Sequence, residues 1–233
     1  MKTLCMVAVA ACGMVVVPDA RGQEANPELQ QKLAAVKESM AANQAALKQY
    51  TWTAHTVVKL KGDVKKTSDE FCRYGPDRKV QKTPLGAPAP QKEMRGVKKR
   101  VVEKKVGELT DYMERAVALI ENYVPPSAAN MQAAFQAGKA TVGQGGPGMI
   151  ELEFGDYVKP GDSLTLEFNS ATKSIAKVSV RSYLDDPKDA VTLDVSFQAL
   201  PDGTNHTAST VLNATAKQVE VNVQNLNYQK AAR

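Results

Sequence analysis

The feature that most constrains this sequence is a two-residue alternation of apolar and polar side chains in its C-terminal third. In residues 191–199 every odd position is apolar and every even position is polar. Alternation of this kind is typical of a strand with one face buried and the other in water. Turn motifs such as Pro160-Gly161-Asp162 and Asp202-Gly203 separate the runs. The pattern predicts an antiparallel meander of six strands, at about 150–154, 164–168, 176–180, 191–199, 206–213 and 218–228.

In the last of these strands the apolar positions change from odd to even. They are odd up to Val223 and even at Leu226 and Tyr228. Because side chains alternate strictly along a strand, one extra residue would produce such a switch. We therefore expect a β-bulge near Gln224 and Asn225.

The N-terminal part of the chain predicts a helix followed by two strands. Asn26-Pro27-Glu28 combines a capping residue, a proline at the first helical position and an acidic first turn. This motif favours a helix from Pro27 to about Gln49. From Tyr50 to Leu60 the apolar period becomes two, as in a half-buried strand. A turn at residues 61–63 then leads to a second strand near 68–74.

The middle of the chain is basic and then helical. Nine Lys or Arg residues lie between Lys79 and Lys105, and the proline-rich stretch 84–90 excludes a helix or a central strand. We expect an exposed basic loop at about 79–100, a helical insertion at about 98–138 and a glycine-rich link at 143–148. The long helix of the insertion, about 97–124, has an apolar stripe with spacings of three and four residues, formed by Val102, Val106, Leu109, Met113, Val117, Ile120 and Val124.

Together these elements predict an α+β fold. Its centre is a large curved antiparallel sheet, a half-barrel-like meander, covered by the N-terminal helix and the central helical insertion. The sequence has 233 residues, of which 43% are hydrophobic. That content is enough to bury a core in a single domain at 23–233.

Residues 1–22 have the pattern of a secretory signal peptide. Lys2 precedes an uncharged run, and Ala20 and Gly22 are small residues at the positions that a signal peptidase reads. We expect a periplasmic or secreted protein without a transmembrane segment in the mature chain, because no apolar stretch after the signal approaches the length that spans a bilayer. A lipid anchor on Cys12 is the minor alternative. Cys72 is then the one cysteine of the mature chain, which excludes an internal disulfide.

The sequence does not favour an enzyme. Its two histidines, His55 and His206, are far apart in the sequence, and no motif pairs either with Cys72. The acidic pairs and clusters suit solvated strand faces and turns, so we expect no metal site and no cofactor. The glycine-rich link precedes a strand, the reverse of the context in a dinucleotide-binding loop. We also expect no nucleic-acid partner, since no aromatic residue interleaves the basic segment.

The order of elements resembles the outer-membrane lipoprotein carrier (LolA-like) superfamily. The matching pieces are the helix from Pro27 to Gln49 entering Tyr50-Thr51-Trp52-Thr53-Ala54, and the strands from Val191 to Tyr228. The resemblance is one of topology over most of the chain. It implies an incomplete antiparallel barrel around an apolar cavity whose mouth is closed by helices.

Two functions remain open at this stage. The resemblance implies noncovalent binding or carriage of a lipid, a lipoprotein acyl chain or another apolar ligand. The candidate cavity residues, each of which would equally suit a filled core, are Trp52, Phe154, Phe168, Val195, Phe197, Val117, Ile120, Met131 and Phe135. The alternative is an envelope interaction or structural module with a packed interior that binds an anionic surface through Lys98, Lys99, Arg100, Lys104 and Lys105.

Overall fold

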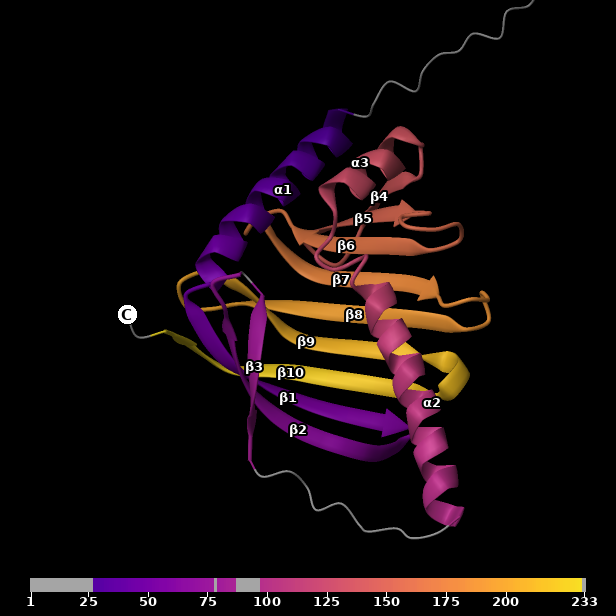
Figure 1. The fold of residues 1–233 in the computed structure, drawn as a ribbon. Helices are drawn as coiled ribbons and strands as arrows, with labels where there is room; N and C mark the ends of the chain where they lie inside the picture. Colours follow the sequence, from indigo (N-terminus) through magenta and orange to yellow (C-terminus); the bar gives the residue numbers. More distant parts are fainter. Residues whose placement is uncertain (1–26, 78, 87–96, 232–233) are drawn as a thin grey trace, which may run out of the picture.

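The computed structural model describes residues 27–77, 79–86 and 97–231. The predicted signal peptide, including Cys12, and residues 87–96 of the predicted basic loop lie outside the described residues. Figure 1 shows a curved sheet with the helices α1, α2 and α3 against it. The expected α+β fold with one large curved antiparallel sheet, half-barrel-like and partly covered by helices, is confirmed.

In the described residues the sheet has ten strands in the order β3-β2-β1-β10-β9-β8-β7-β6-β5-β4. Each neighbouring pair is antiparallel. The helices are α1 (Pro27–Leu47), α2 (Val97–Ile120) and α3 (Ala128–Gln136), with a short 3-10 turn η1 (Thr215–Lys217). The strands are β1 (Tyr50–Leu60), β2 (Asp63–Tyr74), β3 (Val80–Leu85), β4 (Ala140–Gln144), β5 (Met149–Gly155), β6 (Ser163–Asn169), β7 (Ser174–Tyr183), β8 (Ala190–Ala199), β9 (Asn205–Ala214) and β10 (Val219–Lys230).

Two of these strands correct the sequence analysis. The first part of the predicted basic loop forms β3, and β4 extends to Gln144, inside the predicted glycine-rich link. Both are edge strands, and neither alternates apolar and polar residues because little of it is buried. Pro84 is compatible with β3 because an edge strand has one side without a partner. The glycines at 145–148 form the hairpin turn between β4 and β5, where Gly148 adopts a φ of 73°.

The expected bulge in the last strand exists, but a few residues later than predicted. The pairing of β1 with β10 shifts register between Thr51 and Thr53, opposite Gln229 and Leu226. Asn227, which lies between those two partners, has a φ of 56°. A single residue in the left-handed region is typical of such a bulge.

The main core lies on the face of the sheet that carries the helices, which we call the inner face. Cross-strand register aligns one row of apolar side chains from β5 to β9. These side chains are at most 6% exposed, so the predicted alternation of the meander correctly identified its buried face. The row consists of Phe154, Leu164, Val180, Leu193 and Leu212.

The buried face of α2 differs from the predicted stripe. Val106 and Val117 are 56% and 46% exposed, whereas Tyr112 and Ala116 are buried in the main core. The prediction was wrong at these positions because it was based on Val, Leu, Ile and Met residues and omitted tyrosine. A tyrosine ring can be buried while its hydroxyl bonds to a partner. The helix also ends at Ile120, short of the predicted Val124.

Buried polar contacts attach the end of α2 to the sheet. The Tyr123 hydroxyl donates to Asp162 Oδ2 at 2.5 Å and shares a hydrogen bond with Ser182 Oγ at 2.7 Å. Asp162 also accepts the backbone N–H groups of Tyr157 and Lys159, at 2.6 and 2.8 Å. Burial, followed by the bond to Asp162, raises the pKa of Tyr123. One side chain therefore joins the residues after α2 to the β5–β6 turn and to β7.

The N-terminal helix lies across the ends of β7 and β9 (Figure 1). Its Asn43 side chain donates to the carbonyl of Asn205 and accepts the N–H of the same residue, both at 2.6 Å. The Ser39 hydroxyl donates to the carbonyl of Lys173 in the β6–β7 turn. These contacts fix α1 at two hairpin turns of the meander.

We expect Tyr123→Phe to lower the free energy of unfolding by about 1–3 kcal/mol, because buried Asp162 and Ser182 each lose a hydrogen-bond partner. Tyr183→Phe is the matched control, since its hydroxyl bonds the Pro160 carbonyl in an exposed position. That change is expected to cost less than about 1 kcal/mol. Denaturant unfolding of both variants measures the difference, and equal small losses would contradict the role of Tyr123.

Candidate functional site

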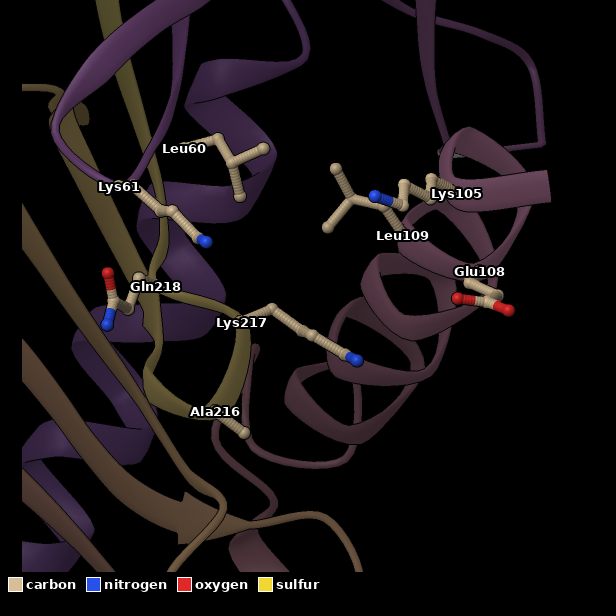
Figure 2. A pocket seen from close by; sticks show the side chains of 8 residues that line it. All are labelled: Leu60, Lys61, Lys105, Glu108, Leu109, Ala216, Lys217 and Gln218. Atoms are coloured by element: carbon tan, nitrogen blue, oxygen red, sulfur yellow. The ribbon is translucent and has the colours of Figure 1, made fainter. Parts of the chain in front are cut away.

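A cleft opens on the inner side of the molecule where α2 passes two neighbouring turns of the sheet (Figure 2). The turns are the β1–β2 hairpin turn and η1, which connects β9 to β10. The cleft has a volume of about 360 Å³. Its lining residues are Leu60, Lys61, Lys105, Glu108, Leu109, Ala216, Lys217 and Gln218.

Backbone geometry holds the two turns together. Lys61 and Gly62 have φ values of 55° and 85°, which define a tight two-residue hairpin turn. The Lys61 N–H donates to the carbonyl of Gln218 at 2.8 Å. Gln218, with a φ of 52°, ends η1 in the left-handed region. Lys61 and Lys217 are therefore held on one wall of the cleft by main-chain contacts.

The opposite wall is α2, which Tyr112 ties to the sheet. The Tyr112 hydroxyl donates to Asp189 Oδ1 at 2.6 Å. Burial, reinforced by the bond to Asp189, raises the pKa of Tyr112 to about 12, against the opposing effect of the backbone of Ala216 and Lys217. Thr215 Oγ1 donates to the Ala190 carbonyl at 3.0 Å, next to Asp189. Asp189 at the end of the β7–β8 turn and Ala190 at the start of β8 thus anchor the two walls.

The cleft combines positive charge with apolar surface. The ammonium groups of Lys61, Lys105 and Lys217 point into the gap from its two walls (Figure 2). Glu108 is the one carboxylate of the lining, and it pairs with Lys104, at 4.0 Å one turn earlier on α2. Leu60 and Leu109, both half-buried, supply the apolar part of the lining.

From the cleft an apolar strip continues along the inner face of β1 and β10. We call it the seam, and it consists of Val58, Leu60, Val221 and Val223. Val58 lies directly opposite Val221, and all four side chains are half-buried. Three of them pack against the main core, and Val223 packs against a second, smaller cluster.

The second cluster lies at the far end of β1 from the cleft. Its buried members are Trp52, Ala54 and Cys72. The Trp52 ring stacks on Tyr228 with ring centroids 5.4 Å apart and 9° between the planes. Burial raises the pKa of the Cys72 thiol, which keeps that thiol neutral. This cluster is a packed aromatic corner of the sheet.

The structure does not gather the nine candidate cavity residues around the cleft. Phe154, Phe168, Val195 and Met131 are buried in the main core, and Phe197, Ile120 and Phe135 are half-buried against it. Trp52 belongs to the second cluster. Val117 is 46% exposed on the outer side of α2, so it does not contribute to the interior.

The five basic candidates all lie on α2, but the structure describes only two of their side chains. Lys98, Lys99 and Arg100 belong to the helix, but their side chains lie outside the described part of the structure. Lys104 is exposed and pairs with Glu108. Of the two candidates with described side chains, Lys105 lines the cleft and Lys104 does not.

Sequence reasoning missed Lys61 and Lys217 as partners of Lys105. Each lies in a turn that the pattern predicted or allowed, but nothing in the local sequence connects residue 61 with residue 217. The information that could have identified them was the order of the strands in the sheet. Once β1 pairs with the last strand, the end of β1 must lie beside the start of β10. The β1–β2 turn, which follows β1, and η1, which precedes β10, then become neighbours.

Other classes of site receive no support from the described residues. They contain no group of three or more His, Cys, Asp or Glu side chains placed to hold a metal ion. None of their helices combines the length and hydropathy required to cross a bilayer.

Comparison with known proteins assigns no family to this chain and finds one of its similarities among solved structures. No family model matches the sequence, and no curated protein matches it significantly. The chain is similar to the solved structure of a DUF1329 family protein from Desulfovibrio piger, with a TM-score of 0.41 and 12% sequence identity. The match covers 85% of this chain and 92% of the other. This similarity is too low to transfer residues or a function.

The burial of the candidate residues predicts two different mutational costs. Phe154→Ala should lower the free energy of unfolding by about 3–5 kcal/mol, because a fully buried ring leaves a void. Phe197→Ala should cost less, about 1.5–3 kcal/mol, because its half-buried ring has fewer neighbours to lose. Phe71→Ala is the control, since that ring is 38% exposed. Denaturant melts compare the three, and a Phe197 cost as large as that of Phe154 would contradict its partial burial.

Proposed function

We propose that this protein is exported to the periplasm and binds a lipid, a lipoprotein acyl chain or another apolar ligand noncovalently on the inner face of its sheet. The observation that carries the proposal is the seam. Its four aliphatic side chains are half-buried although they lie between two packed clusters. When a ligand covers apolar surface that is partly in water, the free energy of the system falls.

Two features of the sequence support this function. The order of helix, strands, helical insertion and meander resembles the lipoprotein carriers, which use the same face of a curved sheet. The pattern of residues 1–22 matches a secretory signal, and export would bring the protein to a compartment bounded by two membranes. The main core is packed, so the ligand on this proposal lies on the seam and does not replace core side chains.

The test is binding of an uncharged fluorescent apolar probe to a matched pair of double variants. Val58→Thr with Val221→Thr places two hydroxyls in the seam, and we expect the probe affinity to fall about fivefold or more. The control is Val57→Thr with Val211→Thr, on the opposite face of the sheet. Val57 and Val211 flank Asn222 through their pairing with β10 and are also half-buried.

The control pair should leave probe affinity unchanged within about twofold. Native mass spectrometry of protein isolated from the envelope provides the companion measurement, with copurified lipid as the expected result. A parent protein that neither binds the probe nor carries lipid would refute the proposal.

The packed main core favours a second candidate, an envelope interaction module that binds an anionic surface through the basic part of α2. Seven of the nine candidate cavity residues belong to that core or pack against it. An interior filled in this way leaves function to the surface, where Lys104 and Lys105 are exposed.

For this second candidate we expect Lys98, Lys99 and Arg100 changed together to Glu to weaken binding to phosphatidylglycerol vesicles by about tenfold or more. Each basic side chain near such a surface contributes about 1 kcal/mol. Thermal stability should hardly change, because a basic segment that binds a vesicle surface must itself be in water, and charges in water contribute little to folding. Lys48, Lys79 and Lys188, all exposed, changed together to Glu serve as the control. If the unmodified protein does not bind these vesicles, the second candidate is rejected.

A further inference from the structure

The three lysines of the cleft come from three separate segments of the chain. Lys61 lies in the β1–β2 turn, Lys217 in η1 and Lys105 on α2. The hydrogen bond from Lys61 N–H to Gln218 fixes the first two, and the Tyr112–Asp189 bond holds α2 opposite them. The positive groups are therefore brought together by the tertiary structure before any ligand is present.

This arrangement leaves positive charge unbalanced. Among the described residues, no ion pair joins Lys61, Lys105 or Lys217 to a carboxylate, although other surface lysines such as Lys59 and Lys177 have such partners. Glu108 faces Lys104 as well as the cleft, so it offsets only part of the charge. Like charges repel when they share a recess, and a bound anion relieves that repulsion.

The apolar residues restrict what kind of anion fits. Leu60 lines the cleft and is also the first member of the seam, whose next members are Val58 and Val221. An anion that enters the cleft thus meets continuous apolar surface on one side. A small inorganic ion would leave Leu60 and Leu109 in water, whereas an amphiphile would cover them.

The size of the cleft fits a headgroup and the start of one chain. Its volume of about 360 Å³ lies at the lower end of the range for ligand sites. The rest of a chain must therefore follow the seam. From Leu60 to Thr56, which pairs with Val223, this path is roughly 13 Å long, at about 3.3 Å per strand residue.

We propose that the cleft between α2, the β1–β2 turn and η1 binds the anionic headgroup, a carboxylate or a phosphate, of a single-chain amphiphile whose chain lies along the seam. Lysine ammonium groups suit both headgroups, because they act as compact charges without a fixed bidentate geometry. This inference rests on the proposed function and specifies the ligand class for the same face of the sheet.

The experiment compares three probes on the purified protein, below their micelle concentrations, by calorimetry. The probes are dodecyl phosphate, uncharged dodecanol and inorganic phosphate. The test variant changes Lys61, Lys105 and Lys217 together to Gln, and the control variant changes Lys48, Lys79 and Lys188 together to Gln. All six side chains are exposed, so both variants should melt at the temperature of the parent.

We expect the test variant to lose about tenfold or more in affinity for dodecyl phosphate and less than about twofold for dodecanol. The control variant should bind both probes like the parent. Added salt should weaken dodecyl phosphate binding to the parent and leave dodecanol binding unchanged, because screening acts on the headgroup alone.

Each failure has a different meaning. Undiminished dodecyl phosphate binding by the test variant would overturn the headgroup site, while dodecanol binding would still support the proposed function. Inorganic phosphate that binds the parent as tightly as dodecyl phosphate would overturn the amphiphile in favour of a free-anion site. If neither dodecyl probe binds the parent, both the inference and the proposed function fail.

Discussion

The pairing of β1 with β10 is the contact on which the rest of this structure depends. Short connections join the other neighbouring strands in the described part of the sheet, but β1 and β10 are brought together from opposite ends of the chain. Contacts such as Lys59 to Glu220 bridge 161 positions. Closing so long a loop costs conformational entropy, which the ladder of main-chain hydrogen bonds between β1 and β10 and the Val58–Val221 contact must offset. Without this pairing the β3-β2-β1 hairpins and the meander would be two separate sheets.

The same pairing divides the inner face into regions with different properties. The Asn227 bulge turns Tyr228 inward, where it stacks on Trp52, and leaves Leu226 outward and 47% exposed. A strand without that extra residue would place Tyr228 on the outer face. The aromatic corner, the seam and the main core therefore follow one another along the inner face. The seam lies between the two packed clusters, and all four of its apolar side chains are partly exposed to water, so a ligand that covers it removes apolar surface from water.

The helices are held to this sheet by tyrosine hydroxyls as well as by apolar contact. Tyr112 and Tyr123 bury their rings in the main core and donate to Asp189 and Asp162. Those bonds set the rotation of α2, so Val106 and Val117 face water and Lys105 faces the two turns. An aliphatic stripe at the same positions would have no directional bond and would leave the rotation to packing alone. The location of Lys105 opposite the two turns thus depends on these polar contacts.

The sequence by itself determined the strands of the meander, the helix beginning at Pro27 and the buried face of each strand from β5 to β8. Local periodicity is sufficient there, because burial on one side of a strand imposes a period of two. It did not determine β3 or β4, whose exposed edge positions have no such period, or the buried face of α2, which hydrogen bonds to Asp189 and Asp162 select. The cleft was decided by the tertiary structure alone. Lys61, Lys105 and Lys217 become neighbours through the pairing of β1 with β10 and the docking of α2, and no local pattern encodes contacts between segments so far apart in the chain.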